Sequence, residues 1–172
     1  GALIADRLAR ELGCPAFIVD PVSVDNMIPE ARLSGVPEVE RVSRSHVLNV
    51  KAVSRRVAGK LGKAFDKCSF VVTHLGGGIS VNALQGGHII DTNDALLGMG
   101  PFSSERAGAL PLRGVVSLAY SGRYKEAELL DKFSRQSGLM AYLGTNDIPE
   151  VERRIRGGDD KARLVLEAMC YQ

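Results

Sequence analysis

The chain has 172 residues, of which 45% are hydrophobic and 24% charged, and its formal net charge is +2. This composition is typical of a folded globular protein and excludes a disordered segment. The lysines and arginines form no block, so we expect no nucleic-acid partner. No apolar run approaches the roughly 18 residues of a membrane span, and residues 1–7 show no basic head followed by an apolar stretch, so we expect neither a membrane span nor a signal peptide.

The cysteines favour a reducing compartment. There are three, Cys14, Cys68 and Cys170, an odd number without a CxxC pair. Zinc knuckles and disulfide frameworks need closer or even-numbered sets. We therefore expect buried free thiols in a cytoplasmic protein.

The first part of the chain predicts two helices and a strand. Apolar residues spaced by four over 2–12 predict a helix that Gly13 ends, and the apolar run 15–20 predicts a buried strand. Prolines and glycines in 21–45 indicate a loop with short helical pieces. Residues 46–64 predict a long helix whose buried face would carry Val50, Val53, Val57 and Leu61.

Three strands and four helices are predicted after residue 68. The runs 69–73, 79–83 and 88–91 are separated by glycine-rich turns, which indicates an antiparallel meander. Apolar spacing then predicts helices at 115–120, at 124–136, around 148–155 and around 162–169. The chain therefore predicts a mixed α/β (α+β) fold.

The most informative motif is the segment Thr73–Ser80, which contains three consecutive glycines between two predicted strands. Glycines remove Cβ atoms and permit positive φ, so backbone N–H groups can converge on an anion there. Neither a P-loop nor a dinucleotide fingerprint fits, since both open a helix. The motif is compatible with a phosphate-binding β-turn or with an ordinary hairpin turn.

Histidines border two of the predicted elements. His46 opens the long helix and His74 lies at the end of a strand, whereas His88 belongs to the second hairpin. Element ends often line clefts in α/β proteins, so His46 and His74 are candidate catalytic groups. Each could equally be a polar core residue, and His88 is expected to be structural or on the surface.

Arg106 and Asp20 are the charged candidates. Arg106 lies in a second glycine-rich loop, where a guanidinium could bind a carboxylate or phosphate, or instead pair with Glu105. Asp20 follows the first predicted strand and could hold a metal or polarise a substrate, or merely cap the turn at Pro21. Asn93 and Asp94 are expected only to shape the loop before Arg106.

The ordered set of motifs is more specific than any one of them. The chain resembles the butyrate kinases of the acetokinase family, within the actin-like, sugar-kinase and Hsp70 ATPase superfamily. Four segments carry this resemblance: Phe17–Pro21, 45–52, 74–81 and 100–108. The resemblance runs through essentially the whole chain, including Gly144 to Ile148.

The resemblance implies a ribonuclease H-like, actin/Hsp70 ATPase-type domain with a mixed sheet and flanking helices. It places residues 1–20 at the end of a first ATPase-like domain, and residues 21–172 in most of a second domain truncated at its C-terminus. It implies phosphoryl transfer from ATP, with Mg²⁺, to a short-chain fatty acid such as butanoate. It also implies a cytoplasmic enzyme that forms a homo-oligomer at full length.

The resemblance also assigns roles to individual residues. His46 would stabilise the transition state, Arg106 would hold the carboxylate or the transferring phosphoryl group, and Asp20 would lie near magnesium. The nucleotide phosphates would be held by the second phosphate loop, that is by His74, Gly76, Gly77, Gly78 and Ser80. Acetate kinases have an asparagine at the position of Gly77 and a second histidine at that of Val50.

Other parts of such a site would lie outside residues 1–172, namely the N-terminal phosphate loop, another substrate arginine, the adenosine-binding glycines and a metal-holding glutamate. We therefore expect the 172-residue chain alone to be inactive. Two other interpretations stay open, a non-catalytic actin/Hsp70-like nucleotide switch and a structural domain whose glycine turns are only turns.

Overall fold

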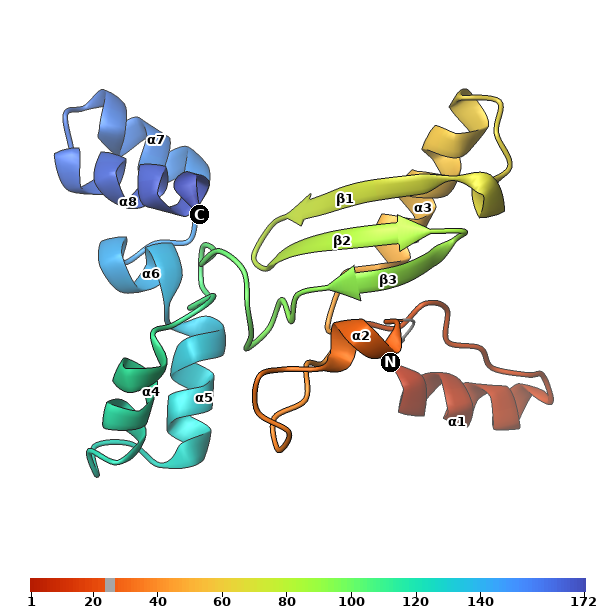
Figure 1. The fold of residues 1–172 in the computed structure, drawn as a ribbon, viewed down its shortest axis with the longest axis horizontal. Helices are drawn as coiled ribbons and strands as arrows, with labels where there is room; N and C mark the ends of the chain where they lie inside the picture. Colours follow the sequence, from red (N-terminus) through yellow and green to blue (C-terminus); the bar gives the residue numbers. More distant parts are fainter. Residues whose placement is uncertain (24–26) are drawn as a thin grey trace.

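The computed structural model describes residues 1–23 and 27–172, with a three-stranded sheet between two groups of helices (Figure 1). Helix α1 spans Ala2–Leu12 and ends at Gly13, whose φ of 64° is the left-handed conformation that suits glycine. The predicted helix and its end are therefore confirmed.

The predicted buried strand at 15–20 is wrong for this chain. The segment belongs to no strand, and the Phe17 side chain is 79% exposed. An extended segment becomes a strand only when a neighbour accepts its hydrogen bonds. The sheet contains only β1, β2 and β3, among the described residues, and none of them pairs with this segment.

Helix α3 spans Val47–Lys60 and follows the short helix α2, Pro29–Arg32. Its existence is confirmed, but its predicted buried face is mostly wrong. Only Val50 of the four predicted residues is buried, while Val53, Val57 and Leu61 are exposed. The buried positions are those that pack close to neighbouring segments: Val47, Val50, Lys51, Ser54 and Ala58.

The sheet is the antiparallel meander that the sequence predicts. Strands β1 (Ser69–Leu75), β2 (Ile79–Gln85) and β3 (His88–Thr92) pair in the order β1-β2-β3. A short 3₁₀ helix, η1 (Phe65–Lys67), leads into β1. An irregularity between Ala83 and Leu84 shifts the register of β2 against β3. His88 is exposed at the β2–β3 hairpin, as expected.

The inner face of the sheet is partly polar. The alternation in β2 buries Ser80, Asn82 and Leu84, while Val81 is 42% exposed. Leu84 joins a hydrophobic cluster with residues of α3 and β3, namely Val47, Val50 and Ile89. This face therefore packs apolar side chains at one end and hydrogen-bonded polar side chains at the other.

The C-terminal half is helical: α4 (Leu112–Ala119), α5 (Glu126–Arg135), α6 (Gly138–Leu143), α7 (Ile148–Arg156) and α8 (Asp160–Tyr171). Four correspond to predicted helices, and α6 was not predicted because its six residues are too few for a clear period. Leu139, Val151, Ala162 and Val165 form a second core. Across residues 1–23 and 27–172, no helix is long and apolar enough to cross a membrane.

All three cysteines are free, but only Cys68 is buried. The expectation of buried thiols is therefore wrong for Cys14 and Cys170. Cys14 follows α1, a helix without a single buried residue, and Cys170 lies near the end of α8.

Candidate functional site

The turn between β1 and β2 consists of three glycines that other groups approach closely. None of Gly76, Gly77 and Gly78 has the positive φ that the sequence suggested. A Cβ at Gly76 would lie 3.2 Å from Nε2 of His74, and one at Gly78 would lie 2.9 Å from Cζ of Arg106. The glycines are needed here because side chains pack against the bare backbone.

Two histidines lie side by side at this turn. The rings of His46 and His74 stack with centroids 3.7 Å apart and planes 9° from parallel. Nδ1 of His74 is 3.1 Å from Oδ1 of Asn49, and Nδ1 of His46 is 2.9 Å from Oγ of Ser80. Residues 34 positions apart thus join the start of α3 to the start of β2.

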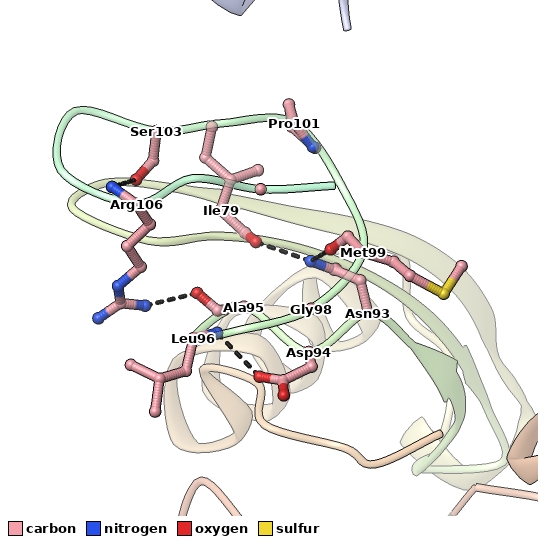
Figure 2. A pocket seen from close by; sticks show the side chains of 11 residues that line it. Ile79, Asn93, Asp94, Ala95, Leu96, Gly98, Met99, Pro101, Ser103 and Arg106 are labelled. Carbon is pink, nitrogen blue, oxygen red and sulfur yellow. Dashed lines mark hydrogen bonds between the residues drawn. The ribbon is translucent and has the colours of Figure 1, made fainter. Parts of the chain in front are cut away.

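Arg106 comes from the loop after β3, and its guanidinium approaches the backbone of Gly78. Figure 2 shows its side chain beside Ala95. Its Nη1 donates to the carbonyl of Ala95 at 2.6 Å, and its backbone N–H donates to Oγ of Ser103 at 3.1 Å. Its Nε is buried and has no hydrogen-bond partner in the described part of the chain. A buried donor without a partner is costly, so this guanidinium is suited to receive an acceptor.

The loop that presents Arg106 is held by the two residues expected to shape it. The Asn93 side chain accepts from the backbone N–H of Val81 and donates to the carbonyls of Ile79 and Met99. Oδ1 of Asp94 accepts from the N–H of Leu96 at 2.9 Å. Ser103 also donates to the carbonyl of Gly77 at 2.6 Å, which ties the two glycine-rich loops together.

The site disfavours a positive charge on His46. Burial lowers the pKa of His46 below its ordinary value of 6.5, and the neighbouring His74 and Arg106 lower it further. Burial removes water from the charged form, and a nearby cation repels it. His46 is therefore a neutral imidazole at pH 7.

Asp20 pairs with two cations of α3 in the structure. Its carboxylate accepts from Nζ of Lys51 at 3.0 Å, and Arg55 lies 3.9 Å away. Lys51 and Asn49 are two positions apart in α3, hence about 160° apart around its axis. Since Asn49 contacts His74, the partner of Asp20 lies on nearly the opposite side of the helix.

Thus the structure brings together His46, His74, Ser80, Arg106 and the Gly76–Gly78 turn. Residues 40–172 match the model of the acetokinase family. The chain belongs to the acetokinase family.

Curated relatives extend this match over the rest of the chain. It is 48% identical to a "Probable butyrate kinase" of Phocaeicola vulgatus over 99% of its own length, and 50% identical to one of Thermotoga petrophila, also over 99%. The aligned part is 48% and 47% of those two proteins. This acetokinase-family chain therefore spans about half the length of the curated relatives it matches.

Solved structures confirm the predicted fold class. An acetate kinase of Porphyromonas gingivalis matches 88% of the chain with a TM-score of 0.75, and a propionate kinase of Francisella tularensis matches 97% with a TM-score of 0.76. Both are 23% identical to the chain and are matched over 40% and 46% of their own lengths. The acetokinase-family chain thus has the actin/Hsp70-type fold of these kinases.

The described residues hold no ready-made metal site with three protein ligands. No group of three or more His, Cys, Asp or Glu side chains suitable for a metal occurs among residues 1–23 and 27–172. Magnesium usually needs one or two free carboxylates besides substrate phosphates. Lys51 and Arg55 flank the carboxylate of Asp20, so a role for Asp20 beside magnesium stays a prediction.

Sequence reasoning missed the polar residues around the histidines. Asn49 contacts His74, and Asn82 lies behind Ser80. The signal for Asn82 was an amide in the middle of a β-strand, where asparagine is uncommon. Asn49 lies within the segment 45–52 that carries the family resemblance, but the sequence analysis assigns it no role.

Proposed function

We propose that the complete protein transfers a phosphoryl group between ATP and a short-chain carboxylic acid, as in butanoate + ATP = butanoyl phosphate + ADP. The observation that carries this proposal is the placement of Arg106 and His46 against one glycine turn. Arg106 offers a planar cation with an unpartnered Nε, and His46 offers a neutral ring. The relatives named "Probable butyrate kinase" support butanoate as the acid.

The arrangement suits this reaction because phosphoryl transfer needs positioning and charge stabilisation more than covalent help. The carboxylate of the acid is itself the nucleophile. Arg106 would hold the transferring phosphoryl group or the acid, and the backbone of Gly76–Gly78 would lie against the nucleotide phosphates. His74 would support the ring of His46 by stacking against one of its faces.

The proposal includes the domain assignment. Residues 1–20 would end a first ATPase-like domain, and residues 21–172 would form most of a second. The rest of the catalytic site would come from the remaining half of the length seen in the relatives, so the 172-residue chain alone is expected to be inactive. Homo-oligomerisation and a cytoplasmic location stay predictions.

Trapping of the acyl phosphate with hydroxylamine tests the proposal. The complete protein is incubated with ATP, magnesium and acetate, propionate, butanoate or isobutanoate, and hydroxamate is measured. We expect more hydroxamate from butanoate or isobutanoate than from acetate. No hydroxamate from any acid, with the protein folded and binding ATP, would favour the nucleotide switch.

Two variants assign the residues. Arg106→Ala and His46→Ala should each lower kcat/KM by about 100-fold or more, the usual loss when one donor to a transition state is removed. Arg135→Ala is the matched control, because its guanidinium is exposed and pairs with Asp131 of the same helix. Unchanged rates in both site variants would refute their catalytic assignment.

A further inference from the structure

A buried polar network lies behind His46. Its centre is Asn82, which is fully buried in the middle strand of the sheet, opposite Val72 on β1 and Thr92 on β3. Asn82 donates to the Val72 carbonyl at 3.0 Å and to Oγ of Ser80 at 3.3 Å. Its Oδ1 accepts from Thr92 at 2.9 Å and from Ser45.

The orientation of the Asn82 amide follows from these partners. A backbone carbonyl can only accept a hydrogen bond, so the amide atom that faces Val72 must be the nitrogen. The oxygen then faces the hydroxyls of Ser45 and Thr92, which can both donate. All four hydrogen-bonding positions of the amide are thus used, and a flipped amide would place its oxygen against the Val72 carbonyl.

This orientation fixes the hydroxyl of Ser80. Because Asn82 Nδ2 donates to Oγ of Ser80, that oxygen acts as an acceptor on this side, and its proton must point elsewhere. Ser80 is fully buried, and Nδ1 of His46 at 2.9 Å is the acceptor that the described residues offer to that proton. Nδ1 of His46 therefore accepts a hydrogen bond and carries no proton.

The surroundings of His46 agree with this assignment. Among the described residues, the charged or titratable groups that act on it are His74 from β1 and Arg106 from the loop after β3, and neither is an anion. Protonation of Nδ1 would also leave the buried Ser80 hydroxyl without an acceptor, which costs free energy. The ring is thus neutral and carries its single proton on Nε2.

We infer that Asn82 and Ser80 are positioning residues that hold His46 as a neutral imidazole with its proton on Nε2. As far as catalysis is concerned, this inference rests on the proposed function. His46 then serves a bound phosphoryl oxygen as a directed hydrogen-bond donor, and the positive charge at the site comes from Arg106. The protonation state itself does not depend on which reaction the protein performs.

Nitrogen NMR of histidine-labelled complete protein at pH 7.5 tests the inference, with His46→Gln identifying the His46 signals. We expect Nδ1 of His46 to have the chemical shift of an unprotonated ring nitrogen, and Nε2 that of a protonated one. A proton on Nδ1, or on both nitrogens, would overturn the inference. The NMR result does not depend on the hydroxamate assay. The protonation state of His46 and the proposed reaction can therefore fail independently of each other.

Three variants test the relay from Asn82 to His46. Ser80→Ala and Asn82→Ala should give signals averaged over both neutral forms of His46, and the acid limb of the pH profile of kcat/KM should move to higher pH. Thr92→Val is the matched control, because it removes a hydroxyl from the same network but leaves the Asn82–Ser80–His46 contacts in place. It should keep the wild-type nitrogen shifts and pH profile.

The outcomes are distinct. If Ser80→Ala keeps the single protonation state, the relay does not set it and the inference is wrong. If Asn82→Ala does not fold, Ser80→Ala still decides, because it removes only one small hydroxyl. If Thr92→Val alters the nitrogen shifts as much as Ser80→Ala does, general loosening of the network explains the result and the inference also fails.

Discussion

The guanidinium of Arg106 lies directly over the backbone of Gly78, where a Cβ would be 2.9 Å from Cζ and closer still to Nη1. The same Nη1 donates to the carbonyl of Ala95, which would itself lie 3.2 Å from that Cβ. The conformation of the glycine turn and the position of the arginine are therefore coupled, although the two residues are 28 positions apart.

This coupling predicts the effect of Gly78→Ala. The added methyl group displaces the guanidinium and not the buried core, so kcat/KM should fall by about 10- to 100-fold, the range expected for misplacement by about 1 Å. The melting temperature should change little. Gly59→Ala is the control, because nothing lies within 4 Å of its Cβ position in α3. An unchanged rate in Gly78→Ala would show that the phosphoryl transfer does not need Arg106 at this position.

The lowered pKa of His46 predicts a pH dependence of stability. Between its lowered folded pKa and the ordinary value of 6.5, the unfolded state binds more protons at this residue than the folded state. The contribution of His46 to the free energy of unfolding is therefore fully present above pH 6.5 and is lost as the pH falls through 6.5 towards the folded pKa. Urea unfolding of the complete protein from pH 5 to 8 measures it.

His46→Gln isolates this contribution, because glutamine does not titrate. We expect the variant to lose less stability between pH 7.5 and pH 5 than the wild type. His88→Gln is the matched control, since His88 is exposed at a hairpin. Equal pH dependence in the wild type and His46→Gln would mean that folding does not perturb the pKa of His46.

The sequence predicted the sheet well because its signals are local. β-branched runs separated by glycines predict adjacent antiparallel strands whatever the rest of the fold does. The pairing of Val72 with Asn82 then follows from the length of the first turn. The pairing of Asn82 with Thr92 also needs the irregularity between Ala83 and Leu84, which the sequence did not predict. Contacts such as His46–Ser80 depend on how α3 lies on the sheet, and no local pattern contains that information.

Two mistakes had a common physical cause. Apolar spacing predicts burial, but Val53, Val57, Phe17 and Val19 are exposed. The buried residues include the polar side chains of Lys51, Ser80 and Asn82. A polar side chain tolerates burial when its hydrogen bonds or charges are matched, and these matches come from distant segments. The carboxylate of Asp20 pairs with the ammonium group of Lys51, and the hydroxyls of Ser45 and Thr92 donate to Oδ1 of Asn82.

The Asp20–Lys51 pair predicts a stability effect that can be separated from catalysis. Both side chains are mostly buried, 15% and 9% exposed, so Lys51→Met removes the nearer of the two cations that pair with the Asp20 carboxylate. We expect a loss of about 1–3 kcal/mol in the free energy of unfolding, the cost of an unmatched, largely buried polar group. Chemical denaturation of the complete protein measures this loss.

Comparison with Asp20→Asn decides whether Asp20 also takes part in the reaction. A purely structural pair predicts similar losses of stability in both variants and similar, small effects on kcat. If Asp20 lies among the reacting groups, Asp20→Asn should lower kcat at least 10-fold more than Lys51→Met does. Equal kcat values in the two variants would remove Asp20 from the catalytic assignment.

Helix α8 provides a prediction that concerns folding alone. Asp159 is its N-cap, and its carboxylate accepts from the N–H of Ala162 at 2.9 Å and from Arg154. The hydrogen bond from Ala162, followed by that from Arg154, lowers the pKa of Asp159. The stabilisation is thus present above the unfolded pKa of this carboxyl and is lost as the pH falls through its folded pKa.

Removal of the cap should lower the melting temperature at pH 7 and leave kcat unchanged, because the buried residues of α8 belong to the second core, with Leu139 and Val151. Asp159→Ala removes both contacts, whereas Asp159→Asn keeps an oxygen for the cap and loses the charge facing Arg154, so its melting temperature should be intermediate. Asp160→Ala, at the first helical position, controls for the loss of an acidic residue near the helix N-terminus. If Asp159→Ala and Asp160→Ala have the same melting temperature at pH 7, the cap does not stabilise this helix in the complete protein. If it melts lower but the difference does not narrow at all as the pH falls below the ordinary value of 3.8, the effect arises from the loss of the side chain and not from its ionised form.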